Sequence, residues 1–99
     1  MKNISEIEKV LRIHKKILKD KFQIDKIGLF GSYVRGENNI NSDIDILVEF
    51  EENADFGFIR FIEIENYLSE LLGVKVDLVE KKALKPKIGK RILDEVIFA

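Results

Sequence analysis

Two stretches of the chain decide its fold: LFGSYVRGE, residues 29–37, and DIDILVEF, residues 43–50. In the second stretch one face is entirely apolar and the other holds Asp43, Asp45, Leu47 and Glu49, which is the pattern of a β-strand that buries one of its faces. The first stretch starts within an apolar run over residues 24–30, which predicts a buried strand that stops at Gly31. We therefore expect two strands, with a turn or a short helix over residues 32–38 between them.

The rest of the chain alternates between helical and strand-like patterns. Apolar residues recur at helical spacing over residues 4–20 and 57–72, and again over residues 86–95, a segment that begins with a proline. Residues 74–80 alternate like a third strand. This order predicts one domain over residues 1–99, with an α/β (α+β) fold in which a small mixed sheet of about three strands is covered by helices.

The composition of the chain excludes several classes of site. There is no cysteine, which excludes disulfides, thiolate nucleophiles and cysteine–zinc sites, and the single histidine, His14, cannot build a multi-histidine metal site. No apolar run approaches the roughly 20 residues of a membrane span, and the N-terminus lacks the apolar core of a signal peptide, so we expect a cytoplasmic protein. With 17 basic and 18 acidic residues, the net charge argues neither for nor against binding to nucleic acid.

Three aspartates on the predicted strands are candidate metal ligands. Asp43 and Asp45 are two residues apart, so they project from one face of their strand with Cα atoms roughly 6.6 Å apart. Carboxylates at that spacing can converge on a hard cation such as Mg²⁺, and Asp77 adds a third carboxylate if its strand lies beside theirs. Alternatively, the aspartates form the solvent-exposed face of an amphipathic strand, although aspartate is disfavoured in strands.

The turn after the first strand is a candidate phosphate-binding segment. Gly31 lets the backbone approach a ligand closely, and Ser32 adds a hydroxyl group and can cap a short helix whose free N–H groups attract phosphate. Arg35, one helical turn later, either reaches the phosphate or pairs with Glu37. The alternative for Gly31-Ser32 is an ordinary turn followed by a helix cap.

These motifs together resemble the signature of the DNA-polymerase-β-like nucleotidyltransferases, in which Gly31-Ser32 is followed after ten residues by Asp43-x-Asp45. The resemblance extends over residues 4–97 and is to the minimal nucleotidyltransferases, MntA-type antitoxins that are paired with HEPN-domain toxins. It implies the polymerase-β-like nucleotidyltransferase fold. It also implies that Gly31 and Ser32 contact phosphate and that Asp43 and Asp45 bind metal.

Four further residues match the family pattern. By resemblance, Asp77 is the third carboxylate, which binds metal and accepts the proton of the attacking hydroxyl group. Asp77 is therefore expected to be catalytic, together with Asp43 and Asp45. Arg35, Gly36 and Glu37 match an Arg-Gly-acid stretch, and from it Arg35 and Gly36 are expected to belong to the nucleotide-binding site.

The resemblance also implies a reaction and a partner. The implied reaction is Mg²⁺-dependent transfer of AMP from ATP to a hydroxyl group, with release of pyrophosphate and with two Mg²⁺ ions as cofactors. The implied acceptor is a tyrosine of a cognate HEPN ribonuclease toxin, which the modification silences. The expected partners are this toxin and ATP, in a homo-oligomer or in a hetero-oligomer with the toxin; no membrane and no direct nucleic-acid partner is expected.

Two other functions stay open at the level of sequence. In the first, the chain neutralises its partner by binding alone, through the basic segment 81–91 or the aromatic patch from Phe56 to Phe61, and the aspartates matter little. In the second, it is a nucleotidyltransferase that modifies a small molecule or an RNA end. Substitution of Asp43 and Asp45 separates the enzymatic function from the binding function, because only the enzyme needs both carboxylates.

Overall fold

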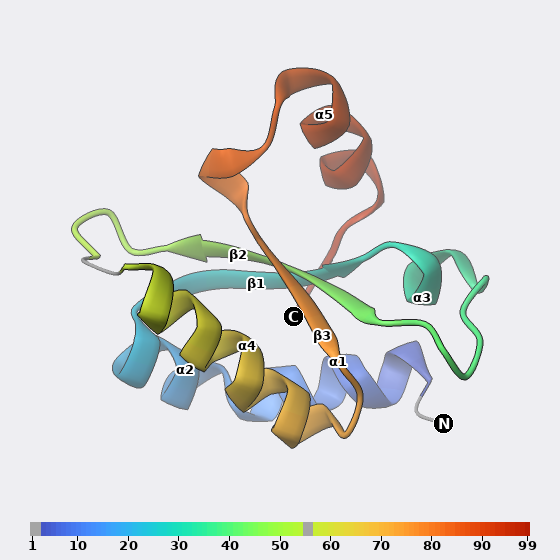
Figure 1. Cartoon of the computed structure of the whole chain (residues 1–99), viewed down its shortest axis with the longest axis horizontal. Helices are drawn as coiled ribbons and strands as arrows, with labels where there is room; N and C mark the ends of the chain where they lie inside the picture. The colour runs from blue at the N-terminus through green and yellow to red at the C-terminus, as the bar shows by residue number, and fades with distance from the viewer. Residues whose placement is uncertain (1–2, 55–56) are drawn as a thin grey trace.

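One mixed β-sheet organises the part of the chain that the computed structural model describes, residues 3–54 and 57–99 (Figure 1). The helices are α1 (Ile4–Ile13), α2 (Lys15–Phe22), α3 (Ser32–Arg35), α4 (Phe58–Leu72) and α5 (Pro86–Glu95), with a 3₁₀ helix η1 (Lys81–Ala83). The strands are β1 (Ile24–Phe30), β2 (Ile44–Phe50), β3 (Val76–Glu80) and β4 (Ile97–Phe98), in the sheet order β3-β2-β1-β4. β2 runs parallel to β3, whereas β1 is antiparallel to both β2 and β4. This arrangement confirms the predicted α/β class.

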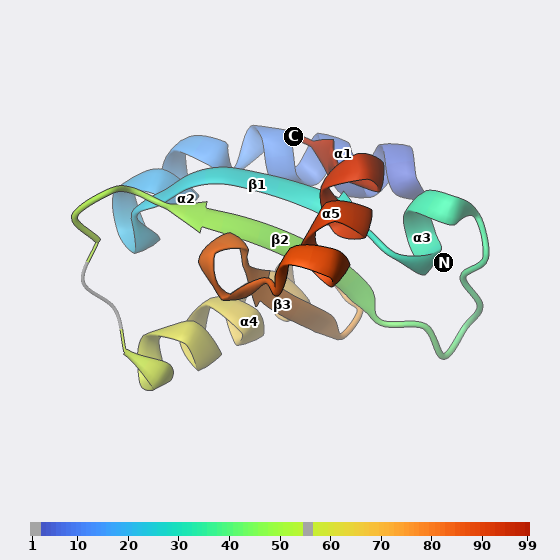
Figure 2. The ribbon, with the colours of Figure 1, turned by 90° about the horizontal axis from the view of Figure 1, so that it is seen from above.

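Helices lie on both faces of the sheet. α1, α2 and α4 cover one face, and α5 stands on the opposite face, as the two perpendicular views show (Figure 1 and Figure 2). The main core lies where α1, α2 and α4 meet the sheet. Each leucine or isoleucine side chain buried there stabilises the fold by about 1.5–3 kcal/mol. The fully buried side chains of that core include Ile7, Leu11, Leu18, Ile44, Ile46, Val48, Ile64, Leu68 and Leu72.

The first predicted helix is interrupted. Residues 4–20 were expected to form one helix, but α1 ends at Ile13 and α2 begins at Lys15. His14 separates them with a φ of −93° and a ψ of 4°, and its Nδ1 lies 2.9 Å from the carbonyl oxygen of Val10. That carbonyl also accepts the backbone N–H of His14. The ring and the backbone of His14 thus compete for the carbonyl oxygen of Val10 at the point where α1 ends.

The sheet has one strand more than the predicted number of about three. β4 contains two residues, which pair as Phe98 with Gly28 and Ile97 with Leu29. A strand this short shows no alternation of apolar and polar residues, so its sequence carries no strand signal. The predicted strands over residues 43–50 and 74–80 begin one and two residues later than expected, at Ile44 and Val76.

The two later helices match their predictions closely. α4 ends at Leu72 and is followed by Gly73, whose φ of 70° is the left-handed conformation that commonly follows a helix. α5 spans residues 86–95 as expected, with its proline in the first turn. Within the described ranges, no helix is both long and apolar enough to cross a membrane.

Candidate active site

Asp45 and Asp77 are directly paired on neighbouring parallel strands. The register of β2 and β3 places Asp45 opposite Asp77 and Ile46 opposite Leu78. Neighbouring strands lie about 4.8 Å apart, so the two carboxylates leave the same face of the sheet as close neighbours. The sequence made this juxtaposition conditional on β3 lying beside β2, and the strand order meets that condition.

Asp43 lies on the approach to β2, two residues before Asp45. Its side chain is 43% exposed, and its Oδ2 is 4.0 Å from the Nζ of Lys75. Half-exposed ion pairs of this length contribute little to stability, so the position of Asp43 is set chiefly by the backbone of β2. Asp43 thus lies immediately before β2, and its negative charge is close enough to raise the pKa of Asp45.

The negative charge around Asp45 is not fully compensated. The pKa of Asp45 is raised chiefly by burial, because burial disfavours the charged form of the carboxylate. The negative charges of Asp77 and Asp43 raise this pKa further. Arg35 acts in the opposite direction and lowers this pKa. The three carboxylates thus interact electrostatically, which agrees with their placement by strand register.

Gly31 lets the carboxylate of Asp45 pack against the end of β1. Gly31 has a φ of 82° and a ψ of −155°, a backbone conformation that is essentially restricted to glycine. A Cβ atom at this position would lie 1.9 Å from the Oδ2 of Asp45. A side chain of any size would therefore displace the carboxylate of Asp45, whereas the close approach of Gly31 to a phosphate stays a prediction.

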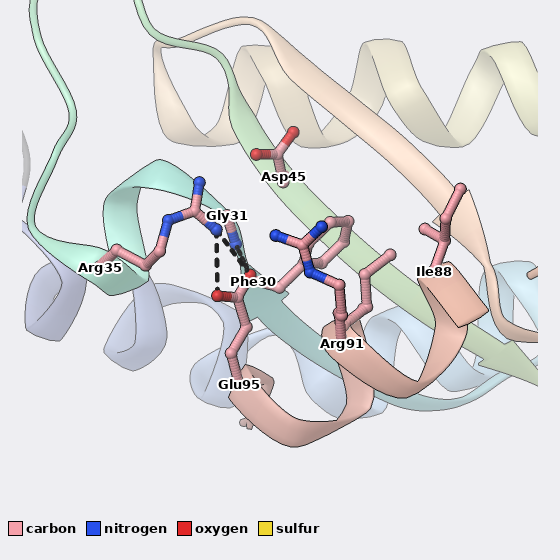
Figure 3. Close-up of a pocket in the computed structure, with 8 residues that line it drawn as sticks. Phe30, Gly31, Arg35, Asp45, Ile88, Arg91 and Glu95 are labelled. Atoms are coloured by element: carbon pink, nitrogen blue, oxygen red, sulfur yellow. Dashed lines mark hydrogen bonds and ion pairs between the residues drawn. The ribbon is translucent and has the colours of Figure 1, made fainter. Parts of the chain in front are cut away.

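Glu95, at the C-terminal end of α5, docks on the same turn. The backbone N–H of Gly31 donates to the Oε2 of Glu95 at 2.8 Å, and Nη1 of Arg35 donates to both carboxylate oxygens at 3.0 Å (Figure 3). Arg35 also donates from Nε to Glu37 at 2.7 Å. Glu37 and Glu95 raise the pKa of Arg35 through these bonds. Of the two sequence-based alternatives for Arg35, the structure shows the pairing with Glu37.

A pocket of about 310 Å³ lies between this turn, β2 and α5 (Figure 3). It brings together three of the predicted site residues, Gly31, Arg35 and Asp45, and adds groups from α5. The lining residues are Phe30, Gly31, Arg35, Asp45, Ile88, Arg91, Ile92 and Glu95.

The other predicted site residues do not line this pocket. Asp43 and Asp77 belong to the carboxylate group beside Asp45, as their effect on its pKa shows. Ser32 is the first residue of α3 rather than its cap; Gly31 takes the cap position and no side chain bonds there. Gly36 ends α3 in the left-handed conformation, with a φ of 71°.

Sequence reasoning missed Glu95 and Arg91 as site residues. Both lie on α5, which is predicted as a helix over residues 86–95 because its apolar residues, Ile88 among them, recur on one face. Arg91 and Glu95 follow Ile88 at helical spacings of three and seven residues, so they share that face. This spacing was the available signal, but the sequence offered the basic segment 81–91 only as a surface for binding a partner.

The donor set of the carboxylates suits Mg²⁺. Among the described residues, no group of three or more His, Cys, Asp or Glu side chains is already arranged to hold a metal ion. Mg²⁺ usually takes one or two carboxylates from a protein and its other ligands from water and substrate phosphates. Asp45 and Asp77 can supply such a pair, and the raised pKa of Asp45 marks negative charge that a divalent cation would neutralise.

The raised pKa of Asp45 predicts how the stability of the metal-free protein depends on pH. The native state holds the Asp45 proton more tightly than the unfolded state, so this group's stabilising contribution is complete below its ordinary pKa of 3.8 and is lost as pH rises through the raised pKa. We expect Asp45→Asn to melt at a higher temperature than wild type at pH 7 in chelator. The difference should shrink as pH is lowered toward 4. A variant that melts below wild type at neutral pH would contradict this.

Comparison with known proteins gives consistent matches over almost the whole chain. The nucleotidyltransferase domain family matches residues 11–99. A Thermococcus cleftensis protein named protein adenylyltransferase MntA is 51% identical over 98 residues, which cover 99% of this chain and 97% of the relative. A Methanocaldococcus jannaschii protein provisionally named a protein adenylyltransferase is 56% identical over 99 residues, covering 99% of each chain. A solved toxin–antitoxin structure with AMP-PNP aligns with a TM-score of 0.73 at 28% identity, over 92% of this chain and 70% of that one.

Proposed function

This chain belongs to the nucleotidyltransferase domain family, and we propose that it transfers AMP from ATP to a hydroxyl group of a protein acceptor. The observation that carries the proposal is the pairing of Asp45 with Asp77 beside the glycine turn at Gly31. Negative charge concentrated next to a close backbone approach suits a site that holds a triphosphate through a cation. The names of the two archaeal relatives, both protein adenylyltransferases, support AMP as the transferred group.

The residues have distinct roles in the proposed reaction. The acceptor hydroxyl oxygen attacks the α-phosphorus of ATP, the bond from that phosphorus to the bridging oxygen of the β-phosphate breaks, and pyrophosphate leaves. Asp77, exposed at the sheet surface, accepts the hydroxyl proton. The turn formed by Gly31 and Ser32 positions the phosphates, and Arg35 and Gly36 shape that turn from its far end.

Asp43, Asp45 and Asp77 would hold Mg²⁺ in this proposal. When bound there, Mg²⁺ ions, two in the proposed complex, neutralise charge that develops on the phosphate oxygens and on the leaving group. The three carboxylates contribute by gathering negative charge where β2 and β3 lie side by side, which is the charge that would hold the cation there.

The proposed acceptor is a tyrosine of a cognate HEPN ribonuclease toxin, which makes this chain an antitoxin. Support comes from the toxin–antitoxin structure with AMP-PNP that aligns with most of the chain. We further propose that the two proteins form a hetero-oligomer and that the reaction takes place in the cytoplasm, where ATP is available.

A binding-only antitoxin is the second candidate function, and an exposed apolar surface favours it. At the start of α4, Phe58 is 79% exposed and Ile59 is 75% exposed. Apolar side chains exposed next to one another are typical of surfaces that contact another protein. Phe61 packs partly against the core, and Phe56, the other end of the predicted aromatic patch, lies outside the described residues.

A labelled-transfer assay distinguishes the two functions. The chain is incubated with α-labelled ATP, Mg²⁺ and the purified product of a neighbouring HEPN-like gene, with and without EDTA. We expect label on the partner only when free Mg²⁺ is present, because the carboxylates need the cation to bind phosphate. A stable complex of the two proteins that never acquires label would refute the enzymatic function and favour binding alone. Label on RNA or a small molecule instead would refute the protein acceptor.

A further inference from the structure

α5 directs one stripe of side chains into the active-site pocket. Ile88, Arg91, Ile92 and Glu95 all line it, and their spacing of three, four and seven residues is that of one helix face. The two isoleucines supply apolar surface to the pocket, although Ile88 is 56% exposed, whereas Arg91 and Glu95 place opposite charges in it. These two charged residues are not accounted for by the motifs that define the carboxylate site.

Arg91 and Arg35 differ in whether their charge is already used. The guanidinium of Arg35 is bonded to Glu37 and Glu95. Arg91 makes no hydrogen bond or ion pair with any described residue, and its guanidinium extends over the pocket toward Asp45 (Figure 3). Among the residues that line the pocket, Arg91 is therefore the cation available to an incoming anion.

The reason that Arg91 is unpaired lies one helical turn away. Arg91 and Glu95 are four residues apart on α5, a spacing at which oppositely charged side chains commonly pair. Glu95 instead accepts hydrogen bonds from the backbone of Gly31 and from Arg35. These bonds fix the end of α5 against the glycine turn, and they occupy the carboxylate that lies four residues after Arg91.

We propose that Arg91 binds the β- and γ-phosphates of the nucleotide and makes the site selective for a triphosphate over a monophosphate. This inference rests on the proposed function. A guanidinium offers a planar fork of donors that matches phosphate oxygens, and a pocket that already contains Asp45 and Glu95 needs added positive charge to accept a polyanion. Glu95 acts as a positioning residue, because it holds α5, and with it Arg91, at the turn.

Equilibrium binding tests the proposal without depending on turnover. Binding of Mg²⁺ complexes of α,β-methylene-ATP, which cannot donate AMP, and of AMP is measured by calorimetry for wild type, Arg91→Ala and Arg91→Lys. Charged hydrogen bonds of this kind predict a loss of about 10–100-fold in affinity for the triphosphate analogue in Arg91→Ala. AMP binding should change by less than about threefold, and Arg91→Lys should recover part of the triphosphate affinity.

Lys87→Ala is the matched control, because it removes the same charge from an exposed position of α5 that lines none of the pockets described. It should bind both nucleotides as wild type does. Equal analogue affinity in Arg91→Ala and wild type, with label transfer intact, would overturn the role of Arg91 alone. An equal loss of AMP and analogue binding would also overturn it. A wild-type protein that binds no analogue and transfers no label would overturn the proposed function as well.

Discussion

Replacing Asp43 and Asp45 together by asparagine is expected to reduce AMP transfer at least about a thousandfold while the protein remains folded. Metal-assisted charge stabilisation is worth several kcal/mol, and each 1.4 kcal/mol corresponds to a factor of ten in rate. Asparagine keeps the size of each side chain but removes the charge that attracts Mg²⁺. The rate of label transfer to the partner from α-labelled ATP, measured at saturating Mg²⁺, gives the effect directly.

The matched control for this experiment is Asp25→Asn. Asp25 is also an aspartate on a strand of the same sheet, but it is exposed on β1 and lines none of the pockets described. Its substitution should leave the transfer rate within about twofold of wild type, because surface substitutions away from a site usually have small effects. If the Asp43→Asn/Asp45→Asn protein retained transfer within tenfold of wild type, the carboxylates would not be the catalytic metal ligands.

Gly31→Ala is expected to lower both stability and activity. The backbone conformation of Gly31 alone costs a non-glycine residue about 1–3 kcal/mol, and the added Cβ must also push the carboxylate of Asp45 away. For a domain of about 100 residues this corresponds to a fall in melting temperature of roughly 10 °C. Thermal denaturation followed by circular dichroism measures the first effect, and transfer of the α-label below the melting temperature measures the second.

Gly73→Ala separates these two consequences. Gly73 also has a positive φ, 70°, but a Cβ there would meet nothing within 4 Å, and the residue ends α4 away from the pocket. This variant should lose about 1–2 kcal/mol of stability through backbone strain and keep its transfer activity. A Gly31→Ala protein that keeps full activity, or equal activity losses in the two variants, would show that contact between Gly31 and Asp45 does not matter for the reaction.

The carboxylate half of the site could be predicted from local sequence. Alternation fixes the face on which Asp43 and Asp45 lie, and a two-residue spacing survives small errors in strand boundaries. The pairing of Asp77 with Asp45 could be predicted only on the condition that their strands are neighbours. The order of strands in a sheet depends on contacts between distant segments, which local sequence does not specify. The same alternation places Leu47 on the face of the aspartates, yet Leu47 is only 1% exposed, so tertiary packing covers this face at that position.

The contribution of α5 to the site could not be predicted from local sequence patterns. The hydrogen bond from Gly31 to Glu95 joins residues 64 positions apart, and no periodicity within either segment specifies it. The basic segment 81–91 has the composition of a solvated surface, and most of its lysines are exposed in the structure. Only the three-dimensional docking of α5 distinguishes Arg91, which faces the pocket, from Lys87, which lines none of the pockets described.

The most direct test of nucleotidyl transfer compares ATP labelled at the α-phosphate with ATP labelled at the γ-phosphate. Wild-type protein, Mg²⁺ and the HEPN-like partner are incubated with each substrate, and both the partner and the released phosphates are analysed. We expect label on the partner from the α-position only, with the γ-label recovered in pyrophosphate in equal amount. Transfer of the γ-label to the partner, or consumption of ATP without pyrophosphate, would contradict it.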